Sequence, residues 1–425
     1  MSTKLISVAL SIVCCLISTL SHAASSTVEK PAIWVYSDLS DPTDLRSHNH
    51  PQNDPDDIVT LAALLLSANR FNIEGIVVAS TNRKNLANPI PFTDKMFKVP
   101  YERAVPFLNA QLGGYQDSVN FHLSSISSAA TADGQPIKFK PNTNYRDLGK
   151  LNTVAAAVEQ LNQKPMYVLS WGPLTESAIL VKHLIDSGNT KALNNLTLVS
   201  HWTTSTIAQG SPEKPFHVAN CRDDWNACTY LHTQAAERTN VKFIELGSTG
   251  QTGIVDGSSG FPKYKQFYHS ALGQVFAAAK FYHQKPDQSD GATFWLLTEF
   301  GPALNTIKND GTLSTTEEKS IRDIFKANGN EIVADLLKRS NIAAKAGALP
   351  VDEVARNFSY AYIKREKLEI YCPFQGQIMV KNAAGSPVLE KALPPGNHKF
   401  QELKITSGLQ VSLTCDQTIK SFTTD

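Results

Sequence analysis

Three aspartates in the first part of the chain have the side chains that could hold a metal ion. Asp38 ends one apolar run, and Asp56 and Asp57 open another. Like charges at this density repel one another, so a bound cation is a natural reason to gather them. The alternative is that Asp56 and Asp57 simply begin a helix, because the helix dipole favours acidic residues there without any ligand. On these residues alone both interpretations stay open.

Local sequence signals indicate which elements position the three aspartates. Residues 33–37 have the pattern of a short buried strand that leads directly into Asp38. Asp54 is a good helix cap, Pro55 suits the first helical position, and an apolar run follows. Residues 53–66 are therefore predicted to form a capped helix whose first turn carries two of the aspartates.

Strand-like and helix-like runs alternate from about residue 30 to residue 300. The predicted strands are 33–37, 73–79, 166–170, 196–200 and 242–246, and the predicted helices are 57–69, 151–161, 176–187 and 224–237. Repeated strand–helix units favour an α/β fold with a mostly parallel sheet and helices on both faces. Ligands bind beyond the carboxyl ends of such strands, so we expect Asp38, residues 80–82 and residues 171–172 to converge there.

Other parts of the chain have a different character. Residues 84–150 are rich in Pro, Asn and Ser and are expected to form long loops over that edge, whereas residues 315–338 look helical. From residue 366, apolar and polar residues alternate between Gly/Pro turns, which is typical of antiparallel strands. We predict a signal peptide over residues 1–23, an α/β domain over 24–365, and a small β-sandwich-like domain over 366–425.

The N-terminal segment predicts export. Lys4 precedes an apolar run, and Ser21-His22-Ala23 is a small-x-small cleavage site. We expect the mature chain to begin near Ala24 and to be secreted or periplasmic, without a membrane segment. An uncleaved anchor is the alternative, although the apolar run is short for a membrane span.

Composition and cysteine content restrict the partners and the compartment. The formal net charge of +1 gives no indication of a nucleic acid or an anionic membrane as partner. Four cysteines follow the signal peptide, which permits two disulfides in an exported chain. We predict local pairing of Cys221 with Cys228 and of Cys372 with Cys415, with buried free thiols as the alternative. A homo-oligomer and a glycan or cell-surface contact through the C-terminal domain stay open.

Five short motifs occur in a fixed order. They are Asp38 with Asp56-Asp57, residues 74–82 (EGIVVASTN), 168–175 (VLSWGPLT), 220–227 (NCRDDWNA), and 289–291 (SDG). In order and interval these motifs resemble the nucleoside hydrolases. The resemblance is closer to the exported nucleoside hydrolase-like family, some members of which are described as cellulose-binding. It covers roughly residues 30 to 300.

The resemblance implies a Ca²⁺ ion at the strand ends. Asp38, Asp57 and Asp290 would supply carboxylate oxygens, and the backbone carbonyl of Trp171 would supply another. Asp56 would act as the general base for a metal-bound water that attacks the anomeric carbon.

The resemblance also implies residues that bind the substrate. Asn82 and Asn220 would hold ribose hydroxyls, and Trp171 beside a glycine suits stacking on a base or a sugar. Each residue has a simpler interpretation: Asn82 ends a strand, Asn220 caps the helix that follows, and Trp171 fills the core. His201 and His217 lie near the expected site, and a structural role is the simpler interpretation for both.

The chain departs from the family pattern at several positions. Tyr36 stands in place of the first aspartate of the opening motif, and the polar loop 39–53 expands the interval before Asp56. Ser289 replaces the histidine that protonates the leaving base in many hydrolases, and Val218 replaces a glutamate near the ribose asparagine.

Three functions follow from these observations. The first is an exported Ca²⁺-dependent N-glycoside hydrolase that acts on a nucleoside or a related ribosyl compound. The second is a catalytically impaired sugar- or ligand-binding protein with the same fold, which the departures motivate. The third is an unrelated glycoside hydrolase with paired carboxylates such as Asp56 and Glu299, whose activity would survive chelation.

Overall fold

The computed structural model describes residues 29–42, 55–80, 88–126, 138–140, 151–238, 240–260, 263–364 and 366–424. Contacts within the chain divide it into two units, Met1–Lys30 and Pro31–Asp425. The predicted signal peptide, Asp54 and Asn82 lie outside the described residues. Across the described ranges, no helix has both the length and the apolar character that crossing a membrane requires.

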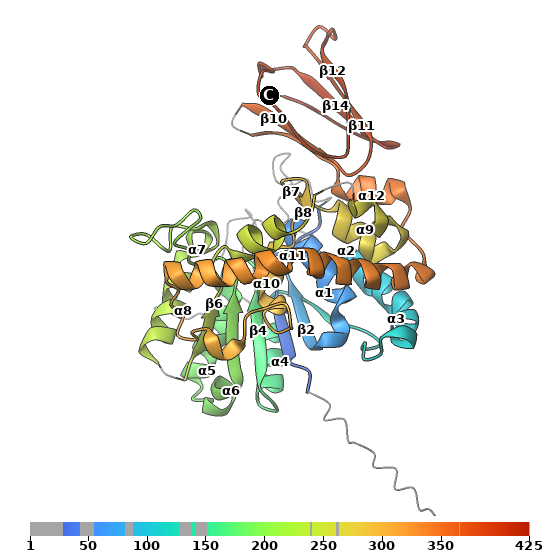
Figure 1. Cartoon of the computed structure of the whole chain (residues 1–425). Helices are drawn as coiled ribbons and strands as arrows, with labels where there is room; N and C mark the ends of the chain where they lie inside the picture. The colour runs from blue at the N-terminus through green and yellow to red at the C-terminus, as the bar shows by residue number, and fades with distance from the viewer. Residues whose placement is uncertain are drawn as a thin grey trace, which may run out of the picture. The chain divides into compact units, whose positions relative to one another are not determined.

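A six-stranded parallel sheet forms the centre of the α/β region (Figure 1). Its strand order is β3-β2-β1-β4-β5-β6. The strands are β1 (Ala32–Tyr36), β2 (Asn72–Val78), β3 (Phe121–Leu123), β4 (Met166–Ser170), β5 (Leu196–Ser200) and β6 (Lys242–Glu245). All five neighbouring pairs are parallel. The predicted strands are thus confirmed to within one residue or so at each end.

Helices cover both faces of this sheet. Successive residues of β1 point to opposite faces, as the two-residue period of a strand requires. Ile33 and Val35 join one buried apolar cluster, and Trp34 and Tyr36 join the other. The first cluster contains residues of four helices: α1 (Pro55–Leu66), α3 (Val99–Gln111), α9 (Ala271–Ala278) and the long α11 (Thr315–Ala343), which is orange in Figure 1. The second cluster contains residues of α4 (Asn152–Leu161), α5 (Thr175–Asp186) and α8 (Trp225–Glu237). The predicted α/β class is confirmed.

Shorter elements complete the α/β region. They are η1 (Ala68–Arg70), α6 (Thr190–Asn195), α7 (Ala219–Asp223), η5 (Gly250–Val255), η6 (Lys263–His269), β7 (Phe281–Tyr282), β8 (Lys285–Pro286), η7 (Ser289–Gly291), α10 (Ala292–Trp295), η8 (Leu304–Thr306), η9 (Ala344–Ala346) and α12 (Val351–Phe358). Strands β7 and β8 pair antiparallel as a small hairpin.

The expectation of loops over residues 84–150 is wrong for a large part of that range. Residues 90–111 form one nearly continuous helical stretch, composed of α2 (Ile90–Thr93), η2 (Asp94–Lys98) and α3. Pro100 and Pro106 both lie within this stretch, although proline has no backbone N–H to donate to a helix. The buried residues Phe97, Tyr101 and Val105 recur every four positions, so their burial outweighs the local preference for turns.

The C-terminal region consists of antiparallel strands, as predicted. One sheet has the order β13-β10-β9 and the other has the order β12-β11-β14-β15. The strands are β9 (Tyr360–Lys364), β10 (Lys367–Cys372), β11 (Gly376–Lys381), β12 (Pro387–Leu393), β13 (Gly396–Phe400), β14 (Gln410–Cys415) and β15 (Thr418–Thr423). A disulfide between Cys372 and Cys415 joins β10 to β14, which confirms the predicted pair. These strands share an apolar cluster of their own.

Candidate functional site

Hydrogen bonds around Asp57 join the end of β1 to the start of α1. The carboxylate of Asp57 accepts a hydrogen bond from Ser37 Oγ and another from the backbone N–H of Leu39, at 3.1 Å. Both donors are sequence neighbours of Asp38, so the start of α1 is joined to the segment that carries Asp38. Both residues are buried, with exposed fractions of 0% and 1%. The first turn of α1 also favours negative charge at Asp57 through the helix dipole.

The residue that follows Trp171 allows β4 to pass close to Asp38. A Cβ atom placed on Gly172 would lie 2.5 Å from Asp38 Oδ2 and 2.7 Å from its Cγ. Gly172 also has a φ of +86°, a conformation that residues with side chains rarely adopt. Glycine is therefore required here by both space and backbone conformation. This contact places the segment after β4 directly against Asp38, as the sequence predicts.

Trp171 is wholly buried and belongs to the core. Its backbone N–H donates to the carbonyl oxygen of Tyr36 at 2.9 Å, which continues the pairing of β1 with β4. Its indole Nε1–H donates to Thr293 Oγ1 at 2.8 Å, and its ring packs against Phe294. Thr293 in turn donates to the carbonyl oxygen of Asp290. The predicted contacts of Trp171 with a metal ion and with a ligand stay predictions.

Asp290 lies against a histidine that follows β5. Its Oδ1 atom is 2.9 Å from His201 Nδ1, and both side chains are buried. The side-chain amide of Asn220 donates to the backbone carbonyl of His201 at 3.0 Å. The side chain of Asp224, not that of Asn220, caps the next helix, because it accepts the N–H of Ala227. The capping interpretation of Asn220 is therefore wrong, and its ribose contact stays a prediction.

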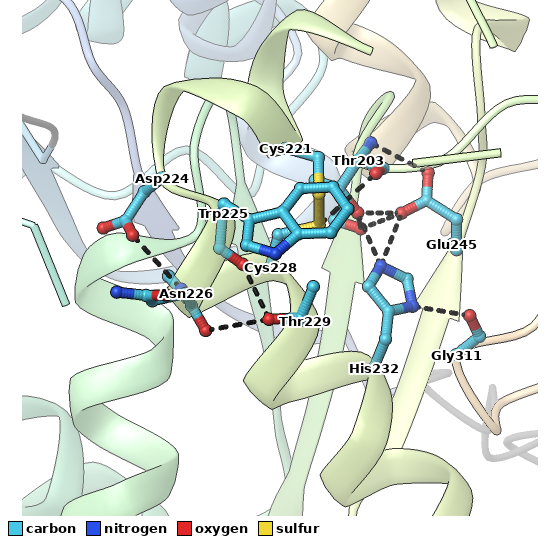
Figure 2. The surroundings of a disulfide bond; sticks show 12 residues. Thr203, Cys221, Asp224, Trp225, Asn226, Cys228, Thr229, His232, Glu245 and Gly311 are labelled. Carbon is cyan, nitrogen blue, oxygen red and sulfur yellow. Dashed lines mark hydrogen bonds and ion pairs between the residues drawn. A yellow bond between two sulfur atoms is a disulfide. The ribbon is translucent and has the colours of Figure 1, made fainter. Parts of the chain in front are cut away.

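A disulfide holds the segment that carries Asn220 (Figure 2). Cys221 in α7 is bonded to Cys228 in α8, which confirms the second predicted pair. Cys228 Sγ lies 3.5 Å from the carbonyl oxygen of Thr203. The hydroxyl of Thr203 contacts the buried carboxylate of Glu245 at the end of β6.

The Thr203 hydroxyl also lies 3.0 Å from Nε2 of His232 (Figure 2). Burial lowers the pKa of His232 to about 4 and raises the pKa of Glu245. His232 is therefore uncharged at neutral pH. Thr203, His232 and Glu245 form a buried polar network beside the disulfide.

Asp56, the predicted general base, forms an ion pair with Lys280. The Nζ atom of Lys280 is 2.8 Å from Asp56 Oδ1 and 3.3 Å from Oδ2 of the buried Asp287. Ser289 Oγ lies 3.5 Å from Asp56 Oδ2, at the long limit of a hydrogen bond. Lys280 was not predicted as a site residue from the sequence. It follows α9, far from Asp56 in the chain, and no local signal indicates that the two side chains pair.

Glu176 is a second residue that the sequence analysis missed. It lies in the first turn of α5 and is almost fully buried. Its carboxyl group accepts hydrogen bonds from the side chains of Ser124 and Thr153 and from the backbone of Ser125. Burial nevertheless raises its pKa to about 7. Burial, followed by the charge of Glu176, also raises the pKa of Tyr36, the residue in place of the first motif aspartate.

The described residues do not by themselves form a three-ligand metal site. Carboxylates suit a hard cation such as Ca²⁺, and Asp57 is hydrogen-bonded to both sequence neighbours of Asp38. However, Asp57 and Asp290 already make the hydrogen bonds given above. No three His, Cys, Asp or Glu side chains within the described ranges are gathered so that they could hold an ion. We therefore assign no catalytic step to a metal.

Glu299, the partner of Asp56 in the paired-carboxylate alternative, has a different neighbour. Its side chain is 60% exposed and forms an ion pair with Arg70, which in turn contacts Asp335 at 3.0 Å. Lys280, not Glu299, is the residue that the structure places against Asp56.

The family comparison agrees with the sequence motifs. Residues 48–238 match the model of a family described as "Cellulose-binding Sde182, nucleoside hydrolase-like domain". The predicted resemblance is confirmed over this stretch. The match to the nucleoside hydrolase-like family includes Asp56, Asp57, Trp171 and Asn220, whereas Asp38 and Asp290 lie outside it. The chain matches no curated protein.

Similar solved structures include a nucleoside hydrolase-related protein from Saccharophagus degradans that is associated with carbohydrate metabolism. It is 13% identical, with a TM-score of 0.47, and the alignment covers 91% of this chain and 94% of that chain. Another is the type III effector protein XopQ complexed with adenosine diphosphate ribose. It is 11% identical, with a TM-score of 0.41, over 72% of this chain and 95% of that chain. At these scores neither likeness supports an assignment of ligand or activity.

The first prediction concerns the contact between Gly172 and Asp38. Gly172→Ala should lower the free energy of unfolding by about 2–4 kcal/mol, because it adds a steric clash to a left-handed backbone conformation. Gly188→Ala is the matched control, since Gly188 also has a positive φ but has open space around it. The control should lose only about 1 kcal/mol in urea unfolding. Equal losses in the two variants would contradict the close approach.

The second prediction concerns the raised pKa of Glu176. The folded state favours the protonated carboxyl group of Glu176. Glu176 therefore contributes most to the free energy of unfolding below the ordinary glutamate pKa of 4.5. This contribution is lost as the pH rises to about 7. The wild type should lose about 2–3 kcal/mol relative to Glu176→Gln across this window, measured by urea unfolding at pH 5 and pH 8. The exposed substitution Glu237→Gln is the control, and it should show the pH dependence of the wild type.

Proposed function

We propose that this protein is an exported N-glycoside hydrolase that acts on a nucleoside or a related ribosyl compound. The observation that carries the proposal is the convergence of buried carboxylates at the carboxyl edge of the parallel sheet. Asp57 accepts hydrogen bonds from Ser37 and Leu39, the two sequence neighbours of Asp38, and Asp290 is held by the residue that follows β5. In α/β folds this edge is where ligands bind, and the match to the nucleoside hydrolase-like family supports the same location.

The chain's own residues can perform most of the required steps. Asp56 is partly exposed, with 18% of its side chain accessible, so it can accept a proton from an attacking water. Cleavage of an N-glycosidic bond develops positive charge on the sugar ring, which the neighbouring carboxylates of Asp38 and Asp57 would stabilise. Asn220 gives one amide hydrogen to His201, so its Oδ1 atom can accept a sugar hydroxyl.

We propose Ca²⁺ as the cofactor, because carboxylate and carbonyl oxygens are its preferred ligands and because the resemblance to the nucleoside hydrolases implies it. Asp38, Asp57 and Asp290 would be the carboxylate ligands, together with the carbonyl oxygen of Trp171. Ca²⁺ requires six to eight oxygens, so the hydroxyls of a bound sugar and water would complete its coordination. A bound Ca²⁺ would also lower the pKa of its water, which is the chemistry that it contributes.

Sugar binding without turnover is the second candidate function. The specific observation in its favour is the ion pair between Asp56 and Lys280, which engages the carboxylate that a hydrolase needs as its base. Ser289, in place of the family's leaving-group histidine, supports the same interpretation. The description of the matched family as cellulose-binding supports a carbohydrate as the class of ligand.

Export is proposed on two observations. The chain begins with a segment that has the pattern of a signal peptide, and two disulfides form in the structure. Disulfides persist in oxidising compartments, which agrees with a secreted or periplasmic location.

The third prediction separates the two candidate functions. The mature wild-type chain with Ca²⁺ should release a nucleobase from at least one member of a nucleoside panel. Asp56→Asn should lower kcat by roughly 100-fold or more, because it removes the base. It should leave ribose binding in calorimetry nearly unchanged. Asp57→Ala should lose both bound calcium and activity.

Asp416→Asn is the control for this experiment, because Asp416 is exposed in a turn of the C-terminal region. It should behave as the wild type in every assay. Ribose binding by the wild type without any base release would establish the binding function instead. Full hydrolysis by a double variant of Asp56→Ala and Asp57→Ala would contradict the assignment of both residues.

A further inference from the structure

A groove in the C-terminal antiparallel region has the size of a ligand site. Its volume is about 840 Å³, within the range of roughly 300–1,000 Å³ typical of ligand pockets. Residues of β12 (labelled in Figure 1) and β13, with the segment that follows β13, line it. We call it the β12–β13 groove. It is separate from the carboxylate site, and its role does not depend on the proposed function.

Positive charge predominates at the rim of the β12–β13 groove. Lys391, Lys399 and Lys404 are exposed, and Glu402 is the acidic residue of the lining. Lys399 lies 3.6 Å from a carboxylate oxygen of Glu369 on β10, a weak and exposed pairing. With Glu402 in the lining and Glu369 beside Lys399, the three lysines leave a net positive charge of one. A ligand that carries negative charge complements this rim.

The lining of the groove is partly apolar and partly hydrogen-bonding. Leu389, Phe400 and Leu403 are half-buried, and the ammonium group of Lys391 lies 5.7 Å from the centre of the Phe400 ring. Gln401 adds a side-chain amide that can donate and accept hydrogen bonds, whereas Asn382 offers its NH₂ group as a donor, because its Oδ1 atom accepts the N–H groups of Ala384 and Ser386. A ligand with flat apolar faces, many hydroxyl groups and carboxylates would match all three features.

The walls of the groove are held in place before any ligand arrives. Strand β12 pairs only with β11, and β13 pairs only with β10, so each is an edge strand of its own sheet. The disulfide between Cys372 and Cys415 ties β10 to β14, the strand on the other side of β11. A preformed groove lowers the entropic cost of binding.

The prolines around the groove argue against an extended peptide as the occupant. A peptide that adds to a sheet edge requires backbone N–H groups along that edge. β12 begins at Pro387, which lacks an N–H donor, and Pro394-Pro395 follow directly after its last residue, so a peptide strand could not continue along this edge beyond Leu393. The concave form also differs from the flat surface that a membrane presents.

We propose that the β12–β13 groove binds an acidic oligosaccharide. The carboxylates of its uronate residues pair with Lys391, Lys399 and Lys404, and a sugar ring packs beside Phe400. The amides of Asn382 and Gln401 bind sugar hydroxyls. The site anchors the protein to an acidic glycan chain, independently of any chemistry at the parallel sheet.

The test measures binding of the mature full-length chain to oligogalacturonate by calorimetry. The variant Lys391→Gln/Lys399→Gln/Lys404→Gln should bind at least roughly tenfold more weakly, since three exposed charge pairs of ordinary strength are lost. The matched control is Lys319→Gln/Lys326→Gln/Lys338→Gln, which removes the same charge from exposed positions of α11. The control should bind as the wild type does. Affinity of the wild type should fall as salt rises.

Several outcomes would overturn the proposal. They are an absence of oligogalacturonate binding, an equal loss in the two triple variants, and equally tight binding of a neutral oligosaccharide of the same length. Equally tight, groove-dependent binding of polyglutamate or of phosphatidylglycerol vesicles would assign the groove to a peptide or a membrane instead. Phe400→Leu is a second variant, which should weaken oligogalacturonate binding and leave any polyglutamate binding unchanged. Thermal melting establishes that each variant is folded.

Discussion

The arrangement of the candidate site depends on the close approach of Gly172 to the carboxylate of Asp38. These residues follow β4 and β1, which are neighbours in the middle of the sheet. Any side chain at position 172 would occupy the space of the Asp38 carboxylate. The backbone at Gly172 therefore packs directly against the Asp38 carboxylate, which brings the segments after the two strands together.

Buried carboxylates at one edge of a sheet require compensation, because removing a charge from water is costly unless it is hydrogen-bonded or paired. The structure supplies a different kind of compensation at each aspartate. Asp57 accepts a hydroxyl and a backbone N–H, Asp290 meets an imidazole, and Asp56 meets an ammonium group. This last pairing bears most directly on function, since the same ion pair that holds Asp56 in place also engages the carboxylate proposed as the base.

Much of the fold could be predicted from the sequence because its signals are local. Strands β4 and β5 have the predicted bounds, since each is a continuous apolar run buried on both faces. The disulfides were predictable because few pairings of four cysteines are local. The helix α3 was missed because its prolines suggest turns, although its buried residues follow a helical period.

The site was only partly predictable. Asp38 could be proposed because it follows a strand, and strand ends converge in a parallel sheet, whereas Asp57 and Asp290 could be proposed only from the order of the family motifs. The pairing of Asp56 with Lys280 could not, because it joins residues far apart in sequence through the packing of α1 against α9 and the segment after it. The buried environment of Glu176 could not either, since it arises from Ser124 and Thr153 on two other segments. Both are three-dimensional contacts that leave no periodic trace in the chain.

The central claim is that the carboxyl edge of the parallel sheet is the ligand site. The most direct test is a crystal structure of the mature chain grown with ribose and Ca²⁺. We expect electron density for ribose at this edge, with its hydroxyls within hydrogen-bond distance of Asp38, Asp57 or Asn220. Ribose bound only elsewhere on the protein, with this edge occupied by water alone, would contradict it.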